Sequence, residues 1–149
     1  MTTAASKLLL AGRAHVRSRL QQRPSIVKND VPSADGAHAT REAAAVLREF
    51  ADLIGVEVGH LRASDKLSDL LRVHRSAVGP DLQSLMQQVG VQEELDPFGF
   101  ELLALVERRV GQNPARLQHP WFQPLPKDED EWIQRIGAMT VTEFVAALS

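Results

Sequence analysis

The stretch "DPFGFELLALVERRVG", residues 96–111, decides the fold because it carries the clearest helical pattern in the chain. Asp96 is a residue type that caps a first turn, and Pro97 suits the first helical position, where no amide donor is needed. A glycine, Gly111, follows the last turn. The apolar residues recur at helical spacing and predict one buried face, made of Phe98, Leu102, Leu105, Val106 and Val110.

The rest of the chain also shows helical rather than strand periodicity. Helix-start signals, which combine capping residues with prolines or glycines, stand at Thr40, at Ser64 or Asp65, at Gly79-Pro80, at Asn113-Pro114 and at Thr140. No segment after residue 38 alternates apolar and polar residues for long. We therefore predict an all-α protein, a small helical bundle.

Length and composition favour one domain without disulfides or a membrane span. The chain has 149 residues, of which 44% are hydrophobic, and no cysteine. It therefore has no thiolate metal site and no cysteine nucleophile, and it suits a reducing compartment. No apolar run approaches the roughly 18 residues that a transmembrane helix needs. We expect a soluble, cytoplasmic protein.

The charge is distributed unevenly. Six of the 17 basic residues and none of the 19 acidic residues lie in residues 1–29. The rest of the chain therefore has 11 basic and 19 acidic residues, a net charge of −8. An acidic body argues against nucleic acid as the partner of the domain.

We place a domain boundary between residues 36 and 37. Residues 24–38 have the proline, glycine and small polar residues of a linker. We expect residues 1–36 to be a flexible basic arm, partly disordered or one amphipathic helix, and residues 37–149 to be a single domain. A helix over 5–22 would have one apolar face, at Leu9, Val16 and Leu20. Docking on the acidic body, a targeting sequence, and contact with a membrane or nucleic acid are its alternative roles.

Taken in order, three pieces of the chain resemble an acyl carrier protein. "AAAVLREFADLIGVEVGHLRASDKLSDLL" (43–71) resembles the first helix and its loop, "FELLALVERRVG" (100–111) the second helix, and "MTVTEFVAAL" (139–148) the last. The resemblance covers roughly residues 40–148, with an extra stretch at 74–94. It implies a helical bundle whose second helix starts at a serine that carries phosphopantetheine.

The chain departs from carriers at that serine. Aligning the second helix by its Glu-Leu pair places Asp96 or Pro97 there, and neither has a hydroxyl to modify. Without an insertion the position falls near Ser76, where Pro80 would break the following helix. Ser84 is followed by leucine but lacks the preceding aspartate. Ser76 and Ser84 are therefore the alternative sites for a phosphopantetheine arm.

The second helix would also differ in charge from that of a carrier. The resemblance implies that partner proteins dock on a negative face of this helix. Here Glu101 and Glu107 share the helix with Arg108 and Arg109, so the negative charge is diluted.

Two other stretches were candidates for function. The acidic run at residues 128–131 lacks the spacing and central glycine of a calcium loop, and we expect it to stabilise a helix N-terminus instead. In "HPWFQPLP" (119–126), Trp121 and Phe122 could anchor a partner. We favour the alternative that they fold back to close one end of the bundle.

The sequence thus predicts a non-catalytic module that binds another protein, without a metal, a catalytic residue or a bound cofactor. The expected contacts are Phe98, Glu101, Arg108, Trp121 and Phe122. Two alternatives remain: a working acyl or peptidyl carrier with phosphopantetheine on an atypical serine, and a small regulatory or secretion-linked protein addressed by its basic N-terminus.

Overall fold

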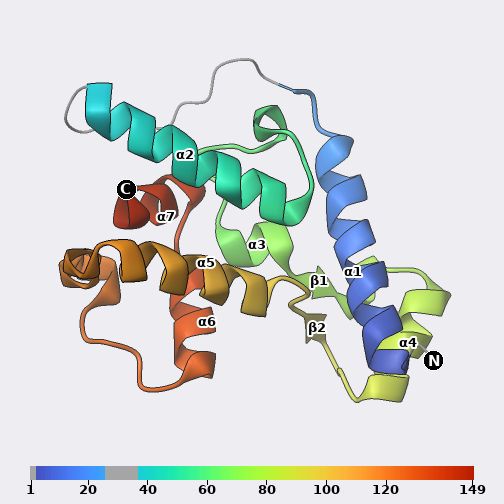
Figure 1. Cartoon of the computed structure of the whole chain (residues 1–149). Coiled ribbons are helices and arrows are strands. Elements are labelled where there is room, and N and C mark those ends of the chain that lie inside the picture. The colour runs from blue at the N-terminus through green and yellow to red at the C-terminus, as the bar shows by residue number, and fades with distance from the viewer. Residues whose placement is uncertain (1–2, 26–36) are drawn as a thin grey trace.

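The computed structural model describes residues 3–25 and 37–149 (Figure 1). Within these ranges the α-helices are α1 Ala4–Gln21, α2 Ala37–Ile54, α3 Leu67–Leu71, α4 Pro80–Val89, α5 Gly99–Gln112, α6 Glu129–Gly137 and α7 Val141–Leu148. The short 3-10 turns are η1 Val58–His60, η2 Arg75–Ala77, η3 Pro114–Gln118 and η4 Pro120–Phe122, and the strands are β1 Val73–His74 and β2 Glu94–Leu95. The predicted all-α fold is confirmed.

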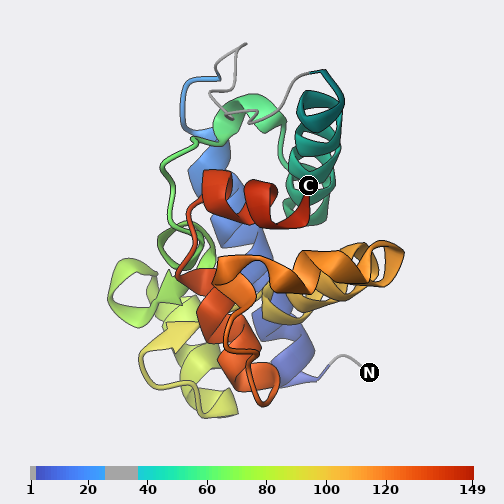
Figure 2. The ribbon, with the colours of Figure 1, turned by 90° about the vertical axis from the view of Figure 1, so that its left-hand side faces the viewer.

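The core forms where α2, α5 and α7 meet. α7 contacts both α2 and α5 and lies between them (Figures 1 and 2). Phe50 of α2 and Phe144 of α7 are fully buried, with ring centroids 5.5 Å apart. α2 ends as predicted at Gly55, whose φ of +90° lies in the left-handed region that favours glycine. None of the described helices is long and apolar enough to cross a bilayer.

α1 is part of this core. Leu8, Val16 and Leu20 are at most 1% exposed and belong to the same cluster as the residues of α2, α5 and α7. A Cβ at Gly12 would lie 2.6 Å from the Leu95 side chain, so only glycine lets α1 approach β2 this closely. Leu9, predicted to face inward, is 37% exposed instead.

The expectation that residues 1–36 form a separate basic arm is therefore corrected. The alternative of one amphipathic helix matches α1, but α1 lies within the domain, because its apolar face is covered by the body. Much of the expected linker lies at residues 26–36, outside the described residues. Its last two residues, Ala37 and His38, belong to α2.

The extra stretch at 74–94 is closed at its base by the two strands. β1 and β2 pair antiparallel, with Val73 opposite Leu95 and His74 opposite Glu94. Between them α4 begins at Pro80, as predicted, and packs on α1. This two-residue ladder is too short to show as alternation in the sequence.

The loop between α5 and α6 folds back on the body. Phe122 is fully buried, and its ring centroid lies 5.6 Å from that of Trp132 in α6. Trp121 is half-buried. The prediction that these aromatic residues close one end of the bundle is confirmed for Phe122, whereas Trp121 packs only partly against the core.

Two helix starts in the C-terminal part of the chain are capped by side chains. Asp128 Oδ1 accepts a hydrogen bond from the Glu131 amide at the start of α6, and Thr140 with Glu143 forms a capping box at the start of α7. The acidic run thus stabilises a helix N-terminus, as expected. In the described residues no three His, Asp or Glu side chains come together in a way that could hold a metal ion.

Candidate functional site

The start of α5 is the position where the carrier resemblance would place a prosthetic-group serine. The helix begins at Gly99, two residues later than predicted, with Phe98 as its cap residue. The Leu102 amide donates to the Phe98 carbonyl at 2.9 Å. Pro97 and Phe98 are buried, and Pro97 packs on Gly12 of α1. This packing, which the sequence does not show, delays the first turn, so Asp96 is not its cap.

A small apolar cavity lies beside this helix start, between α3, α5 and α6. Its walls are mostly aliphatic, and its polar edge is formed by Asp96 and Arg72. The space inside is about 10 Å³, the lower limit for one water molecule. The cavity is therefore a packing defect next to a charged pair.

Asp96 is the half-buried acidic group at this site whose pKa is shifted. Burial raises the pKa of its carboxyl. The positive charge of Arg72, with Nε 4.0 Å from Oδ2, and the Phe98 amide act in the opposite direction and do not cancel the effect of burial. Arg72 is shared, because it also pairs with Glu94 at 3.2 Å. The charged form of Asp96 is therefore disfavoured in the folded protein.

This shift predicts that Asp96→Asn stabilises the protein at pH 7. Because the pKa of Asp96 is higher in the folded protein than in the unfolded chain, protonation of Asp96 favours folding. This contribution to stability is complete below the unfolded-state pKa of about 3.8, and it is lost as the pH rises through the folded-state pKa. Urea unfolding at pH 7 should give a higher free energy of unfolding for the variant, with the difference gone near pH 3. A less stable variant at pH 7 would show that the attraction of Arg72 outweighs burial.

α1 covers one side of the α5 start. Arg13 forms an ion pair with Glu101, donates from Nε to the Pro97 carbonyl at 3.0 Å, and lies 5.8 Å from the centroid of the Phe98 ring. The charge of Glu101, expected to meet a partner, is thus already balanced from within the chain.

The five residues expected to contact a partner differ in how far they are buried. Phe98 is 1% exposed and Phe122 is fully buried, so neither can contact a partner, and that prediction is wrong for both. Both rings pack in the hydrophobic core instead. Glu101 and Trp121 are partly exposed and Arg108 is exposed, so these three remain predictions. Sequence reasoning missed Phe100, which is 69% exposed.

The two alternative serines lie away from α5. Ser76 is exposed in the 3-10 turn η2, and Ser84 is exposed in the middle of α4. Neither stands at the start of a helix, unlike the position that the resemblance implies.

A charged cluster joins the other end of α5 to α2. Arg109 is only 5% exposed, and its guanidinium lies 3.3 Å from Glu42 and 2.9 Å from Glu49. Arg116 in η3 also reaches Glu42, at 3.5 Å. The neighbouring Arg108 remains exposed and approaches Glu49 at 3.6 Å. Position 109 follows Leu102, Leu105 and Val106 at helical spacing, which is the signal that could have predicted its burial.

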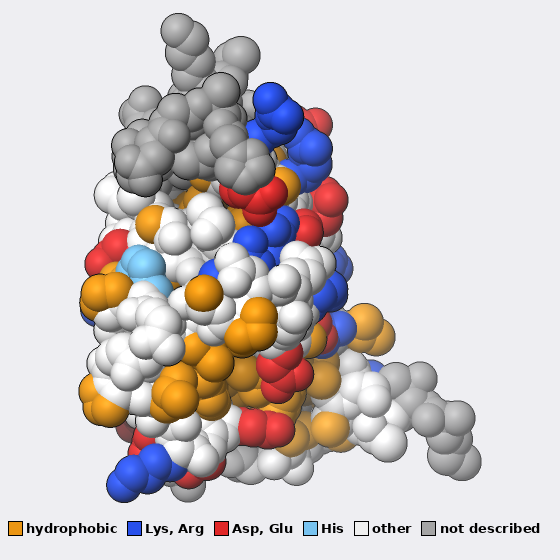
Figure 3. Space-filling view, turned by 60° about the vertical axis from the view of Figure 1, so that its left-hand side comes forward, with side chains coloured by type: hydrophobic (Ala, Val, Ile, Leu, Met, Phe, Trp, Pro, Cys, Tyr) orange, Lys and Arg blue, Asp and Glu red, His pale blue; other side chains and the backbone are white. Residues whose placement is uncertain are grey.

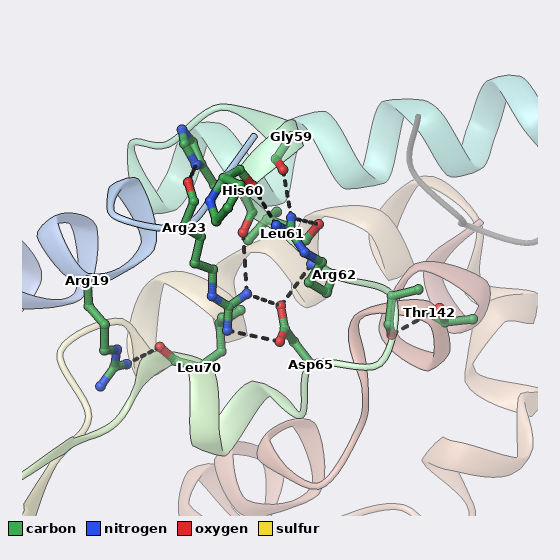
Figure 4. A network of polar contacts seen from close by, with 11 residues as sticks. Arg19, Arg23, Gly59, His60, Leu61, Arg62, Asp65, Leu70 and Thr142 are labelled. Atoms are coloured by element: carbon green, nitrogen blue, oxygen red, sulfur yellow. Dashed lines mark hydrogen bonds and ion pairs between the residues drawn. The ribbon is translucent and has the colours of Figure 1, made fainter. Parts of the chain in front are cut away.

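A second polar network ties the end of α1 to the loop before α3 (Figure 4). Both guanidinium nitrogens of Arg23 donate to the Asp65 carboxylate, at 2.7 and 3.1 Å, and the Arg62 amide donates to the same group at 2.8 Å. Arg19 donates to the Leu70 carbonyl. Asp65 lies in the segment that resembles the first loop of a carrier, and here its carboxylate ties the end of α1 to this loop.

One face of the molecule exposes a group of apolar side chains (Figure 3). Figure 3 shows apolar side chains gathered over the lower half of one face, with acidic side chains beside them and basic ones at the upper right. Exposed apolar side chains among charges are normal for a folded protein, so this face by itself names no ligand.

Comparisons with models of protein families, with curated proteins and with solved structures found no match to this chain. The carrier resemblance therefore stays a prediction, and the function rests on the geometry described above.

Proposed function

We propose that this protein is a non-catalytic module with an acyl-carrier-like helical fold that binds another protein and carries no prosthetic group. The observation that supports this most is the construction of the α5 start. Of the residues aligned with the carrier serine, Pro97 packs against α1 and Asp96 lines a cavity with room for about one water molecule. Neither residue has a hydroxyl to which an arm could be bonded.

Binding through the surface is supported by the outer face of α5. Phe100 is 69% exposed, and Ala104, Glu107 and Arg108 follow it on the exposed side of the helix. Exposed large aromatic residues are the kind that contribute most to protein–protein binding.

We place the protein in the cytoplasm, in line with its lack of cysteine.

Co-expression with a broad-specificity phosphopantetheinyl transferase tests the absence of an arm. We expect the intact mass of the purified protein to remain that of the unmodified chain, because no serine stands at the start of α5, where the carrier resemblance would place it. A genuine carrier protein, modified in the same cells, is the positive control.

A mass gain of one arm would overturn this proposal and make the protein a working carrier. Ser76→Ala and Ser84→Ala would then show which serine is modified, since only the true site abolishes the gain. Both serines are exposed, so the two variants should fold alike.

A further inference from the structure

A polar hollow lies at the base of the extra stretch, beside the ladder of β1 and β2. The space inside is about 530 Å³, which is within the range of small-molecule sites. Its lining consists of His74, Arg75, Ser76, Gln83, Gln92 and Glu93. All six side chains are polar and four of them are exposed, so the hollow is open to solvent and a ligand would bind through polar contacts.

Hydrogen bonds hold the residues around this hollow in place. The Arg75 amide donates to the Glu93 carbonyl at 2.8 Å. The side-chain amide of Gln83, in the first turn of α4, donates to the Arg75 carbonyl at 3.0 Å and to the Val78 carbonyl at 2.9 Å. Both amide hydrogens of Gln83 are used in this way, which leaves its oxygen as the acceptor for a ligand. The hollow is therefore built from three segments that are already linked to one another.

Two opposite charges line the hollow without pairing with each other. His74 lies opposite Glu94 in the ladder, so the same register places Arg75 opposite Glu93. Opposite charges at such positions commonly attract each other across the strands. In the described part of the chain, however, neither Arg75 nor Glu93 forms an ion pair. One cation and one anion thus remain available to a ligand.

The neighbouring carboxylate of Glu94 does not change this balance. It lies 3.2 Å from Arg72 and 3.4 Å from His74, so its charge is already compensated. A ligand with a single charge would be attracted by one side of the hollow and repelled by the other. A ligand that carries both charges would be attracted by both sides.

We propose that this hollow binds a small zwitterion, of which a free α-amino acid is the simplest kind. The Arg75 guanidinium would bind the carboxylate and the Glu93 carboxylate would bind the ammonium group, both through charge-assisted hydrogen bonds. The Gln83 oxygen, the Gln92 amide and the Ser76 hydroxyl would contact a polar side chain of the ligand. The site is separate from α5, so this inference goes beyond the proposed function.

Ligand-observed NMR with the full-length protein tests this proposal, with the common amino acids in small mixtures at pH 7 and low salt. We expect at least one to bind with a Kd on the order of 1 mM, because charged groups open to water interact weakly. Arg75→Gln and Glu93→Gln should each weaken this binding about fivefold or more. Arg48→Gln and Glu107→Gln are the matched controls, because they remove the same charges at exposed positions outside the hollow.

Two derivatives of the bound amino acid separate its charges. The N-acetyl derivative has no ammonium group and the carboxamide has no carboxylate, so both should bind several times more weakly. A derivative that binds as tightly as the amino acid itself would overturn the proposal, and so would binding that is unchanged in Arg75→Gln and Glu93→Gln. No binding of any amino acid at about 10 mM would also overturn it. Circular dichroism confirms that each variant is folded, and the intact-mass experiment tests the proposed function separately.

Discussion

Replacing Val16 by aspartate should destabilise the whole protein by about 3–5 kcal/mol, because it puts a charge into an apolar site and removes core contacts. Val16 is fully buried in the core shared by α1, α2, α5 and α7. A loss of this size is a large part of the stability of a small domain. Urea unfolding followed by circular dichroism should show one transition shifted to lower urea, or a chain already largely unfolded.

Ala14→Asp is the matched control for this experiment. Ala14 is exposed on the same helix, two residues away, so the change should shift the free energy of unfolding by no more than about 0.5 kcal/mol. Equal small effects of both changes would mean that α1 is a detachable arm after all. That result would restore the alternative of a protein addressed by its N-terminus, which needs α1 to be free of the core.

Arg109→Ala should cost about 2–4 kcal/mol, the second largest effect that we expect. Removing one partner of a buried ion pair leaves charges without compensation and a cavity in the packing. The carboxylates of Glu42 and Glu49 are over one third exposed, which keeps the cost toward the lower end of this range. The measurement is the free energy of unfolding in urea at pH 7.

Two further variants separate charge from packing at this position. Arg109→Met keeps most of the side-chain volume, so a smaller loss than with alanine would show that packing contributes much of the effect. Arg108→Ala removes an exposed guanidinium next in the chain and should cost at most about 1 kcal/mol. If alanine at position 108 costs as much as at position 109, the burial of Arg109 is not the cause.

The helices could be predicted wherever their start and stop signals are local. Gly79-Pro80 begins α4, Gly55 ends α2, and Thr140 caps α7, each as the sequence indicates. A cap or a left-handed glycine acts within one turn of chain, so neighbouring residues are enough to specify it. The all-α class follows from these elements together.

The sequence was less informative wherever the outcome depends on a distant segment. The start of α5 is displaced by contact of Pro97 with Gly12, about 85 residues away. Phe98 is buried and Phe100 is exposed, although both are phenylalanines in the same stretch. Periodicity gives the relative orientation of side chains around a helix, but it does not say how wide the covered face is.

What the sequence alone determined is therefore the set of helices, their caps and the lack of a serine at the start of α5. Only the tertiary structure decided that the basic N-terminal helix belongs to the core and that Arg13 balances Glu101. The physical reason is the range of the interactions: hydrogen bonds of turns and caps form between near neighbours, whereas burial and ion pairing depend on which helix covers which, and this depends on the packing of the whole chain.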